Sequence, residues 1–193
     1  MRPARLSHFW PLALFVLAAA WATTSPCALA QAAAPMAAKS GTTGMAMPKP
    51  PAPLSNFLTL TVKEKATTFS VADLAAMSQK TVKVHNAHSN ANESYTGVLL
   101  SDLLAQAGFV ADTTTHQTML HSIVRAEGTD KYWVVYSATE VEGAEHAGVV
   151  IVAISQDGHN LGADGNLKLI STDDKKPQRW VRNLTSIKFQ AVQ

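Results

Sequence analysis

The segment Tyr95-Thr-Gly-Val-Leu-Leu-Ser-Asp-Leu-Leu-Ala-Gln-Ala-Gly108 joins the end of a strand directly to the clearest helix of the chain. Leu99, Leu103 and Ala107 share one helical face. Gly108 follows at the position where a left-handed residue commonly ends a helix. This segment therefore predicts a strand that leads into a short helix with one buried face.

The segments on both sides alternate polar and apolar residues with the period of a strand. The continuous apolar segment 149–154 is typical of a strand buried on both faces. Two short helices are predicted, at residues 139–142 and at residues 70–77, where Ser70 and Asp73 have capping-box spacing. Strands outnumber helices, so we expect an α+β fold with a mixed, mostly antiparallel sheet and short helices. The predicted strands are residues 58–63, 81–85, 92–96 (a hairpin with 81–85), 121–126, 131–137, 149–154, 167–171 and 184–189.

The first thirty residues have the pattern of a secretory signal peptide. Arg2 and Arg5 precede the apolar segment 9–22, and Ala28-Leu-Ala30 is the small-x-small pattern that a signal peptidase cleaves. The apolar segment has about fourteen residues, short of the roughly twenty that a membrane-spanning helix needs. We therefore expect cleavage near Ala30, a periplasmic or secreted protein, and no membrane span after cleavage.

Composition divides the rest of the chain into two parts. Residues 31–54 are rich in alanine and proline and predict a disordered linker, whereas residues 55–193 predict one folded domain. Beyond residue 30 the chain has fourteen basic and fourteen acidic side chains, a balance that does not favour nucleic-acid binding. The single cysteine, Cys27, lies in the predicted leader, which excludes a disulfide, a thiolate metal site and a cysteine nucleophile from the folded domain.

Three segments, in this order, carry a resemblance to a known family. They are Tyr95 to Gly108, Asp130-Lys-Tyr-Trp-Val-Val-Tyr-Ser137, and Gly165-Asn-Leu-Lys-Leu-Ile through Arg179-Trp-Val-Arg-Asn-Leu-Thr-Ser-Ile187. Together they resemble the molybdopterin-binding domain of the sulfite oxidase family, across nearly all of residues 58–190. The resemblance implies the sulfite-oxidase-type α+β fold and a molybdenum pterin as cofactor.

The chain departs from the family at the metal ligand. In sulfite oxidases a cysteine thiolate follows the strand that resembles Thr81 to Val84, whereas this chain has His85, Asn86 and Ala87 there. A neutral imidazole lacks the charge and softness of a thiolate. The leader also lacks the twin-arginine pair that exports proteins already folded around a cofactor, because Pro3 and Ala4 separate its arginines.

The candidate binding residues form a basic cluster that the resemblance places near the pterin and its phosphate. Arginine offers a bidentate fork to phosphate, and lysine adds a point charge. The same cluster could instead be a solvated turn beside a packed tryptophan. The resemblance adds two positions that follow the segment Thr81 to Val84, namely His85 and Asn86. The predicted cofactor-binding residues are Lys176, Arg179, Trp180, Arg182, His85 and Asn86.

Three functions remain open from the sequence. The first is a binding module for a pterin, another small anion or a partner protein, without thiolate-ligated molybdenum chemistry. The second is a molybdopterin-dependent oxidoreductase that passes electrons to a separate redox partner. The third is a metal-binding protein that uses His85 and His88, although two ligands alone do not complete a zinc site. We predict no catalytic residues, because no hydrolase or nucleotide-binding motif is present.

Overall fold

The structure, a computed structural model, describes residues 52–109, 115–143 and 146–192, which all lie in the unit Pro48–Gln193. The predicted signal peptide and all but the last three residues of the predicted linker lie outside the described residues. Within the described ranges, no helix is long and apolar enough to cross a membrane.

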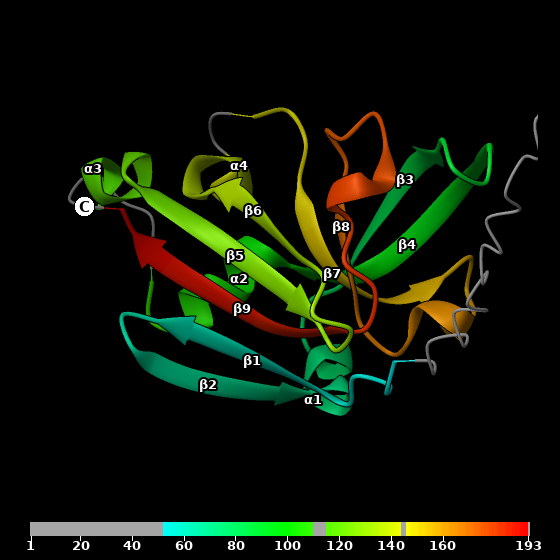
Figure 1. Cartoon of the computed structure of the whole chain (residues 1–193), viewed down its shortest axis with the longest axis horizontal. Helices are drawn as coiled ribbons and strands as arrows, with labels where there is room; N and C mark the ends of the chain where they lie inside the picture. The colour runs from blue at the N-terminus through cyan, green and yellow to red at the C-terminus, as the bar shows by residue number, and fades with distance from the viewer. Residues whose placement is uncertain (1–51, 110–114, 144–145, 193) are drawn as a thin grey trace, which may run out of the picture. The chain divides into compact units, whose positions relative to one another are not determined.

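Five strands form the first sheet, in the order β2-β1-β9-β5-β6 (Figure 1). Only β1 and β9 pair in parallel, and the other neighbours are antiparallel. The predicted turn between β5 and β6 is present, since Gly128 donates to the Tyr132 carbonyl and accepts from Lys131. The bounds of the strands are Phe57–Val62 (β1), Lys65–Ser70 (β2), Ser122–Gly128 (β5), Trp133–Ser137 (β6) and Leu184–Ala191 (β9).

Four antiparallel strands form the second sheet, in the order β3-β4-β7-β8. The predicted hairpin is the β3–β4 pair, in which Val84 lies opposite Glu93. The predicted central strand is β7, which lies between β4 and β8. The bounds of the strands are Lys80–Asn86 (β3), Ala91–Leu99 (β4), Val150–Gln156 (β7) and Lys168–Ser171 (β8).

The helices are short, and α1, α2 and α4 lie where the sequence predicts them. Ser70 and Asp73 form the capping box of α1, and Gly108 has φ +90° just after α2. Helix α2 contacts β1 of one sheet and β4 and β7 of the other. The bounds are Val71–Ala76 (α1), Leu100–Gln106 (α2), His116–Leu120 (α3), Ala138–Glu142 (α4), and the 3-10 turns Gly162–Asp164 (η1) and Pro177–Arg179 (η2).

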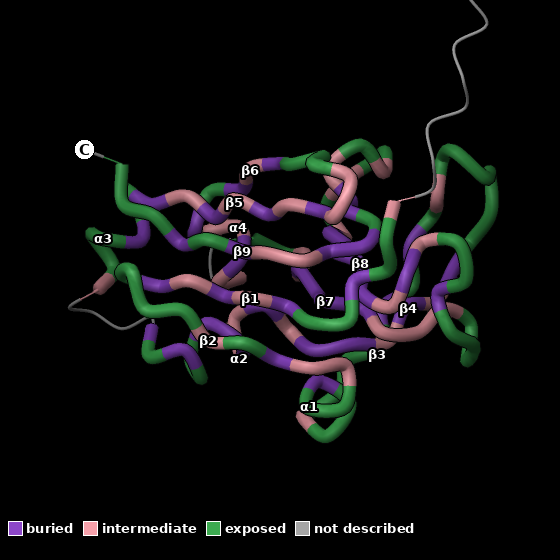
Figure 2. Tube along the Cα trace, turned by 60° about the horizontal axis from the view of Figure 1, so that its bottom comes forward, coloured by how far each residue is buried: buried purple, intermediate pink, exposed green. Residues whose placement is uncertain are grey.

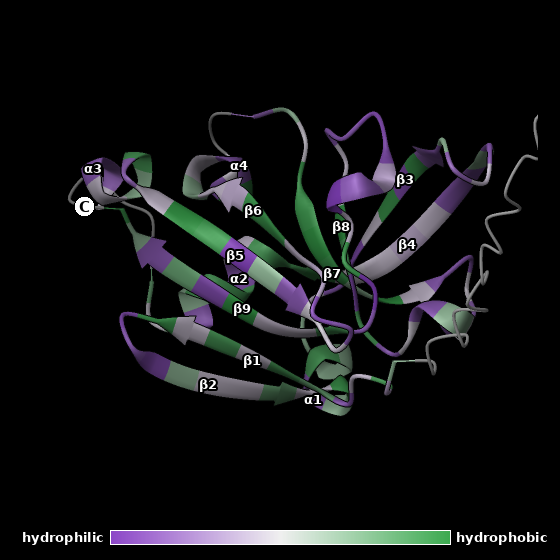
Figure 3. Cartoon of the chain, viewed as in Figure 1, coloured by the Kyte–Doolittle hydropathy of each residue, from purple (hydrophilic) through white to green (hydrophobic). Residues whose placement is uncertain are grey.

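Strand β7 is buried on both faces, as its apolar sequence predicts, and its residues belong to two hydrophobic cores. Figure 2 shows buried residues along β7, and Figure 3 shows that the strand is hydrophobic. Val150 and Val152 belong to the larger core, which also holds buried side chains of β1, α2 and β9. Ile151 and Ala153 face the smaller core, which contains Trp180 and side chains of β3 and β4. The smaller core supports the candidate site described below.

The fold prediction is confirmed, and the structure adds two elements that the sequence did not predict. Strand β2 was not predicted because Phe69 is its only buried residue, so its sequence lacks the alternation of a half-buried strand. Helix α3 was not predicted because it has five residues and buries only Met119.

Candidate functional site

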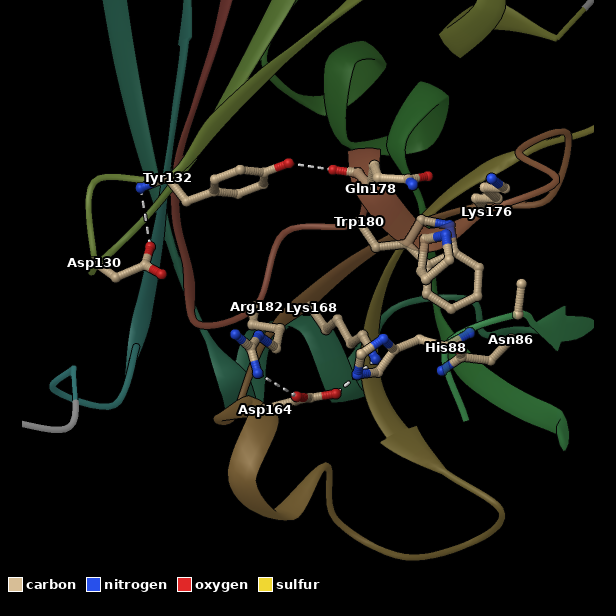
Figure 4. A pocket seen from close by; sticks show the side chains of 12 residues that line it. Asn86, His88, Asp130, Tyr132, Asp164, Lys168, Lys176, Gln178, Trp180 and Arg182 are labelled. Atoms are coloured by element: carbon tan, nitrogen blue, oxygen red, sulfur yellow. Dashed lines mark hydrogen bonds and ion pairs between the residues drawn. The ribbon is translucent and has the colours of Figure 1, made fainter. Parts of the chain in front are cut away.

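Three segments of the chain enclose a cavity of about 620 Å³ (Figure 4). The β3–β4 connection contributes residues 86–88, the β5–β6 turn contributes Asp130 and Tyr132, and residues between Asp164 and Arg182 complete the lining. This volume lies within the range typical of small-molecule sites, roughly 300–1,000 Å³.

The segment around η2 is held to the β5–β6 turn and to the second sheet. The Tyr132 hydroxyl donates to the carbonyl of Gln178, and Tyr136 donates to that of Arg179 at 2.6 Å. Trp180 is buried, and its Nε1 donates to the Ser171 carbonyl at 3.1 Å. These bonds attach the segment around η2 to the β5–β6 turn and to strands β6 and β8, so this wall of the cavity is fixed in position.

The structure brings together four of the six predicted binding residues. Asn86, Lys176, Trp180 and Arg182 line the cavity, on segments that are about ninety residues apart in sequence. His85 does not line it: its side chain is exposed on β3, and its Nδ1 lies 3.1 Å from Asn92 Oδ1. Trp180 also packs in the smaller core, so the binding and packing interpretations of this residue are compatible.

Arg179, the sixth predicted residue, also lies outside the cavity lining. Its guanidinium binds Glu140 at 3.1 Å and Asp174 at 2.5 Å, and lies 4.5 Å from the centre of the Tyr136 ring. Hydrogen bonds to Asp174 are the main cause that raises the pKa of Arg179, and Glu140 adds to them. Arg179 therefore holds η2 against α4.

We expect Arg179→Gln to lower the free energy of unfolding by about 1–2 kcal/mol, because two carboxylates lose a charged donor. Arg182→Gln should change it by less than about 0.5 kcal/mol, because the Arg182 side chain is 66% exposed and 3.8 Å from Asp164. Urea denaturation of both variants measures the difference. An equal loss in both variants would show that Arg179 does not hold η2.

Lys168 is a lining residue that the sequence analysis did not select. It is 4% exposed on β8, and its Nζ donates to Asp164 Oδ2 at 2.6 Å and to Tyr95 Oη at 2.8 Å. The ammonium also lies 4.6 Å from the centre of the Tyr95 ring and 5.4 Å from that of Trp180. The available sequence signal was a lysine within the apolar segment Leu167 to Ile170, since lysine is almost never fully buried without a partner.

Tyr95 links Lys168 to a second carboxylate, Glu93. The Tyr95 hydroxyl donates to Glu93 Oε2 at 2.7 Å. Burial is the main cause that raises the pKa of Tyr95 well above its ordinary value, followed by Glu93 and Asp164, so this phenol stays neutral. It therefore accepts from Lys168 and donates to Glu93 without titrating at neutral pH.

Glu93 ties the β3–β4 connection to this network. Burial acts to raise the pKa of Glu93, but hydrogen bonds from Tyr95, Ser89 and Asn86 and the charge of Lys168 together lower it below its ordinary value. Asn86 Nδ2 donates to both Glu93 oxygens, at 3.0 and 3.1 Å, and Ser89 Oγ donates at 2.8 Å. The wall of the cavity at residues 86–88 is therefore anchored to an ionised, buried carboxylate.

The donor set of the cavity fits an organic anion and does not fit a thiolate-held metal. Three cations, Lys168, Lys176 and Arg182, suit phosphate or carboxylate oxygens, and Trp180 and Tyr132 offer aromatic surface. No cysteine follows Cys27 in the sequence. Among the described residues, no group of three histidine, cysteine or acidic side chains could hold a metal ion. The cationic and aromatic lining residues thus fit the pterin part of the implied cofactor, and the lining supplies no thiolate for its molybdenum.

Comparison with known proteins identifies the fold. No protein-family model and no curated protein matches the chain. Among solved structures, the chain is similar to the sulfane dehydrogenase SoxCD of Paracoccus pantotrophus, with a TM-score of 0.54 and 20% identity over 70% of this chain. It spans 39% of the length of that protein. The chain therefore has the α+β fold of the sulfite-oxidase-type molybdopterin-binding domain.

Proposed function

We propose that this chain is a binding module for a small organic anion with a planar ring, such as a pterin, and that it performs no thiolate-ligated molybdenum chemistry. The observation that carries the proposal is a cavity with three cations and two aromatic rings but no thiolate. Lys176 and Arg182 would hold the anionic group, and Trp180 and Tyr132 would contact the ring. Its location in the periplasm or outside the cell belongs to the same proposal.

Pterin-6-carboxylate tests the proposal, because it is a planar, fluorescent anion. We expect saturable quenching of its fluorescence by the purified mature chain. The double variant Lys176→Gln/Arg182→Gln should weaken binding by about twofold to thirtyfold, since each of the two exposed ion pairs contributes about 0.2–1 kcal/mol. Lys175→Gln is the matched control, because Lys175 is exposed, adjacent in sequence and outside the cavity lining. Equal loss in control and double variant would contradict binding in this cavity.

The rival function is a molybdopterin-dependent oxidoreductase that passes electrons to a partner protein, and the likeness to a sulfane dehydrogenase favours it. The implied cofactor would supply the oxygen-atom or electron transfer in that case. Two purifications distinguish the functions, one from a host that makes molybdopterin and one from a host that cannot. Near-stoichiometric molybdenum from the first host alone, measured by mass spectrometry, would establish the rival. Folded protein without molybdenum from both hosts supports the binding module.

A further inference from the structure

Lys168 forms the floor of the cavity and still has one hydrogen atom to donate. An ammonium group has three N–H donors. Two of them bind Tyr95 Oη and Asp164 Oδ2, and among the described residues the third forms no hydrogen bond and has only the rings of Tyr95 and Trp180 nearby, at 4.6 and 5.4 Å from the ammonium. Because the side chain borders the cavity, this third donor is available to a ligand.

The positive charge of Lys168 is already compensated. Asp164 Oδ2 lies 2.6 Å from the ammonium. The neutral hydroxyl of Tyr95 connects Lys168 to Glu93 by hydrogen bonds. The charge of Lys168 also contributes to the lowered pKa of Glu93. One cation thus meets two carboxylates at the floor. An anionic group of a ligand placed at the floor would be repelled by both carboxylates.

Positive charge that is less closely paired lies instead at the rim of the cavity, on the exposed side chains of Lys176 and Arg182. Lys176 is exposed, and no carboxylate in the described ranges forms an ion pair with it. The nearest ion-pair distance from Arg182 is 3.8 Å, to Asp164, which already binds Lys168 at 2.6 Å. Figure 4 shows these two cations on different sides of the cavity, with the side chain of Lys168 next to that of Arg182.

We infer that the ligand presents an uncharged hydrogen-bond acceptor, such as a carbonyl oxygen or a ring nitrogen, to Lys168 and keeps its anionic group at the rim. This inference rests on the proposed function and narrows its ligand class. The ligand is an organic molecule with a neutral inner end and an acidic outer end. Inorganic oxoanions lack the neutral end and are excluded as the preferred ligand.

Asp164→Asn tests this assignment, because the amide keeps the size of the side chain and its acceptor for Lys168 but removes the charge. Removal of one of the two compensating carboxylates should strengthen binding of inorganic phosphate by about tenfold. Binding of pterin-6-carboxylate should change by less than about threefold, because its neutral end faces Lys168 in both proteins. Isothermal titration calorimetry of the full mature chain measures both affinities. Asp102→Asn, on α2 and outside the cavity lining, is the matched control.

The wild-type chain alone provides a second test that needs no variant to fold. It should bind pterin-6-carboxylate at least about tenfold more tightly than phosphate. Phosphate binding as tight as that of pterin-6-carboxylate, or unchanged phosphate affinity in a folded Asp164→Asn variant, would overturn the inference and leave the proposed function intact. If the wild-type chain binds neither probe, the proposed function itself fails.

Discussion

Lys168→Met is expected to lower the free energy of unfolding by about 3–5 kcal/mol, the largest loss that we predict for a single side chain. Methionine fills nearly the same space, but Asp164 and the Tyr95 hydroxyl then lose the ammonium that binds them. Asp164 is partly buried, with 22% of its side chain exposed, and a carboxylate that loses its cation in such a position costs more than the ion pair did. Equilibrium denaturation by urea at neutral pH measures the loss.

The pH dependence of this loss identifies its cause. The folded-state pKa of Glu93 lies below its ordinary value, so Glu93 stabilises the fold above the unfolded-state pKa, and this contribution disappears as the pH falls through the folded-state value. Lys168 contributes to that lowering. The difference in stability between wild type and Lys168→Met should therefore narrow as the pH falls.

Lys188→Met, at an exposed position of β9, is the control and should stay within about 0.5 kcal/mol of wild type. A loss below about 1 kcal/mol at neutral pH would show that the ion pair at Lys168 does not stabilise the fold.

The sequence predicted those strands and helices whose pattern of apolar residues matches the faces that are buried in the structure. Strand β7 is apolar at every core position because both of its faces are buried. Helix α2 has one apolar face because it contacts strands of both sheets and its buried side chains belong to the larger core. Strand β2 is different: its partner β1 supplies the hydrogen bonds, and its own side chains are mostly exposed, so the local sequence contains no strand signal.

The candidate site was predictable only where its residues are close together in sequence. Lys176, Trp180 and Arg182 lie within seven positions, and a basic cluster beside a tryptophan is visible to inspection. Tyr95 and Lys168 are 73 positions apart and meet because β4 and β8 both pair with β7. The periodicity of apolar residues along the sequence does not indicate such a long-range contact. For the same reason the sequence did not show that Arg179 binds Glu140, 39 positions away, rather than a ligand.

The missing thiolate limits what the fold implies about function. A shared fold does not fix the chemistry of a cavity, because the chemistry depends on the side chains that line it. Asn86 occupies the end of β3 here, and its amide is used to hold Glu93 rather than a metal. Asn86 is thus part of a hydrogen-bond network that stabilises the cavity wall.

Gly97→Ala is expected to lower the free energy of unfolding by about 3 kcal/mol, through a clash between backbones. Gly97 lies on β4 at the register shift with β7, two residues after Tyr95. A Cβ atom added there would lie 2.0 Å from the Val152 carbonyl oxygen and 2.5 Å from Ala153 Cα. Both neighbours are backbone atoms of the central strand, so they can move only if the β4–β7 hydrogen bonds lengthen.

Gly108→Ala separates this clash from the general cost of replacing a glycine. Gly108 has φ +90° but no atom within 4 Å of an added Cβ, so the substitution should cost only about 1 kcal/mol of backbone strain. Thermal or urea denaturation of both variants gives the comparison. Equal losses would mean that β4 and β7 are not closely packed at Gly97. A greater loss in Gly97→Ala, together with weaker binding of pterin-6-carboxylate, would show that the close approach of β4 to β7 positions Tyr95, and through Tyr95 the ammonium of Lys168, at the floor of the cavity.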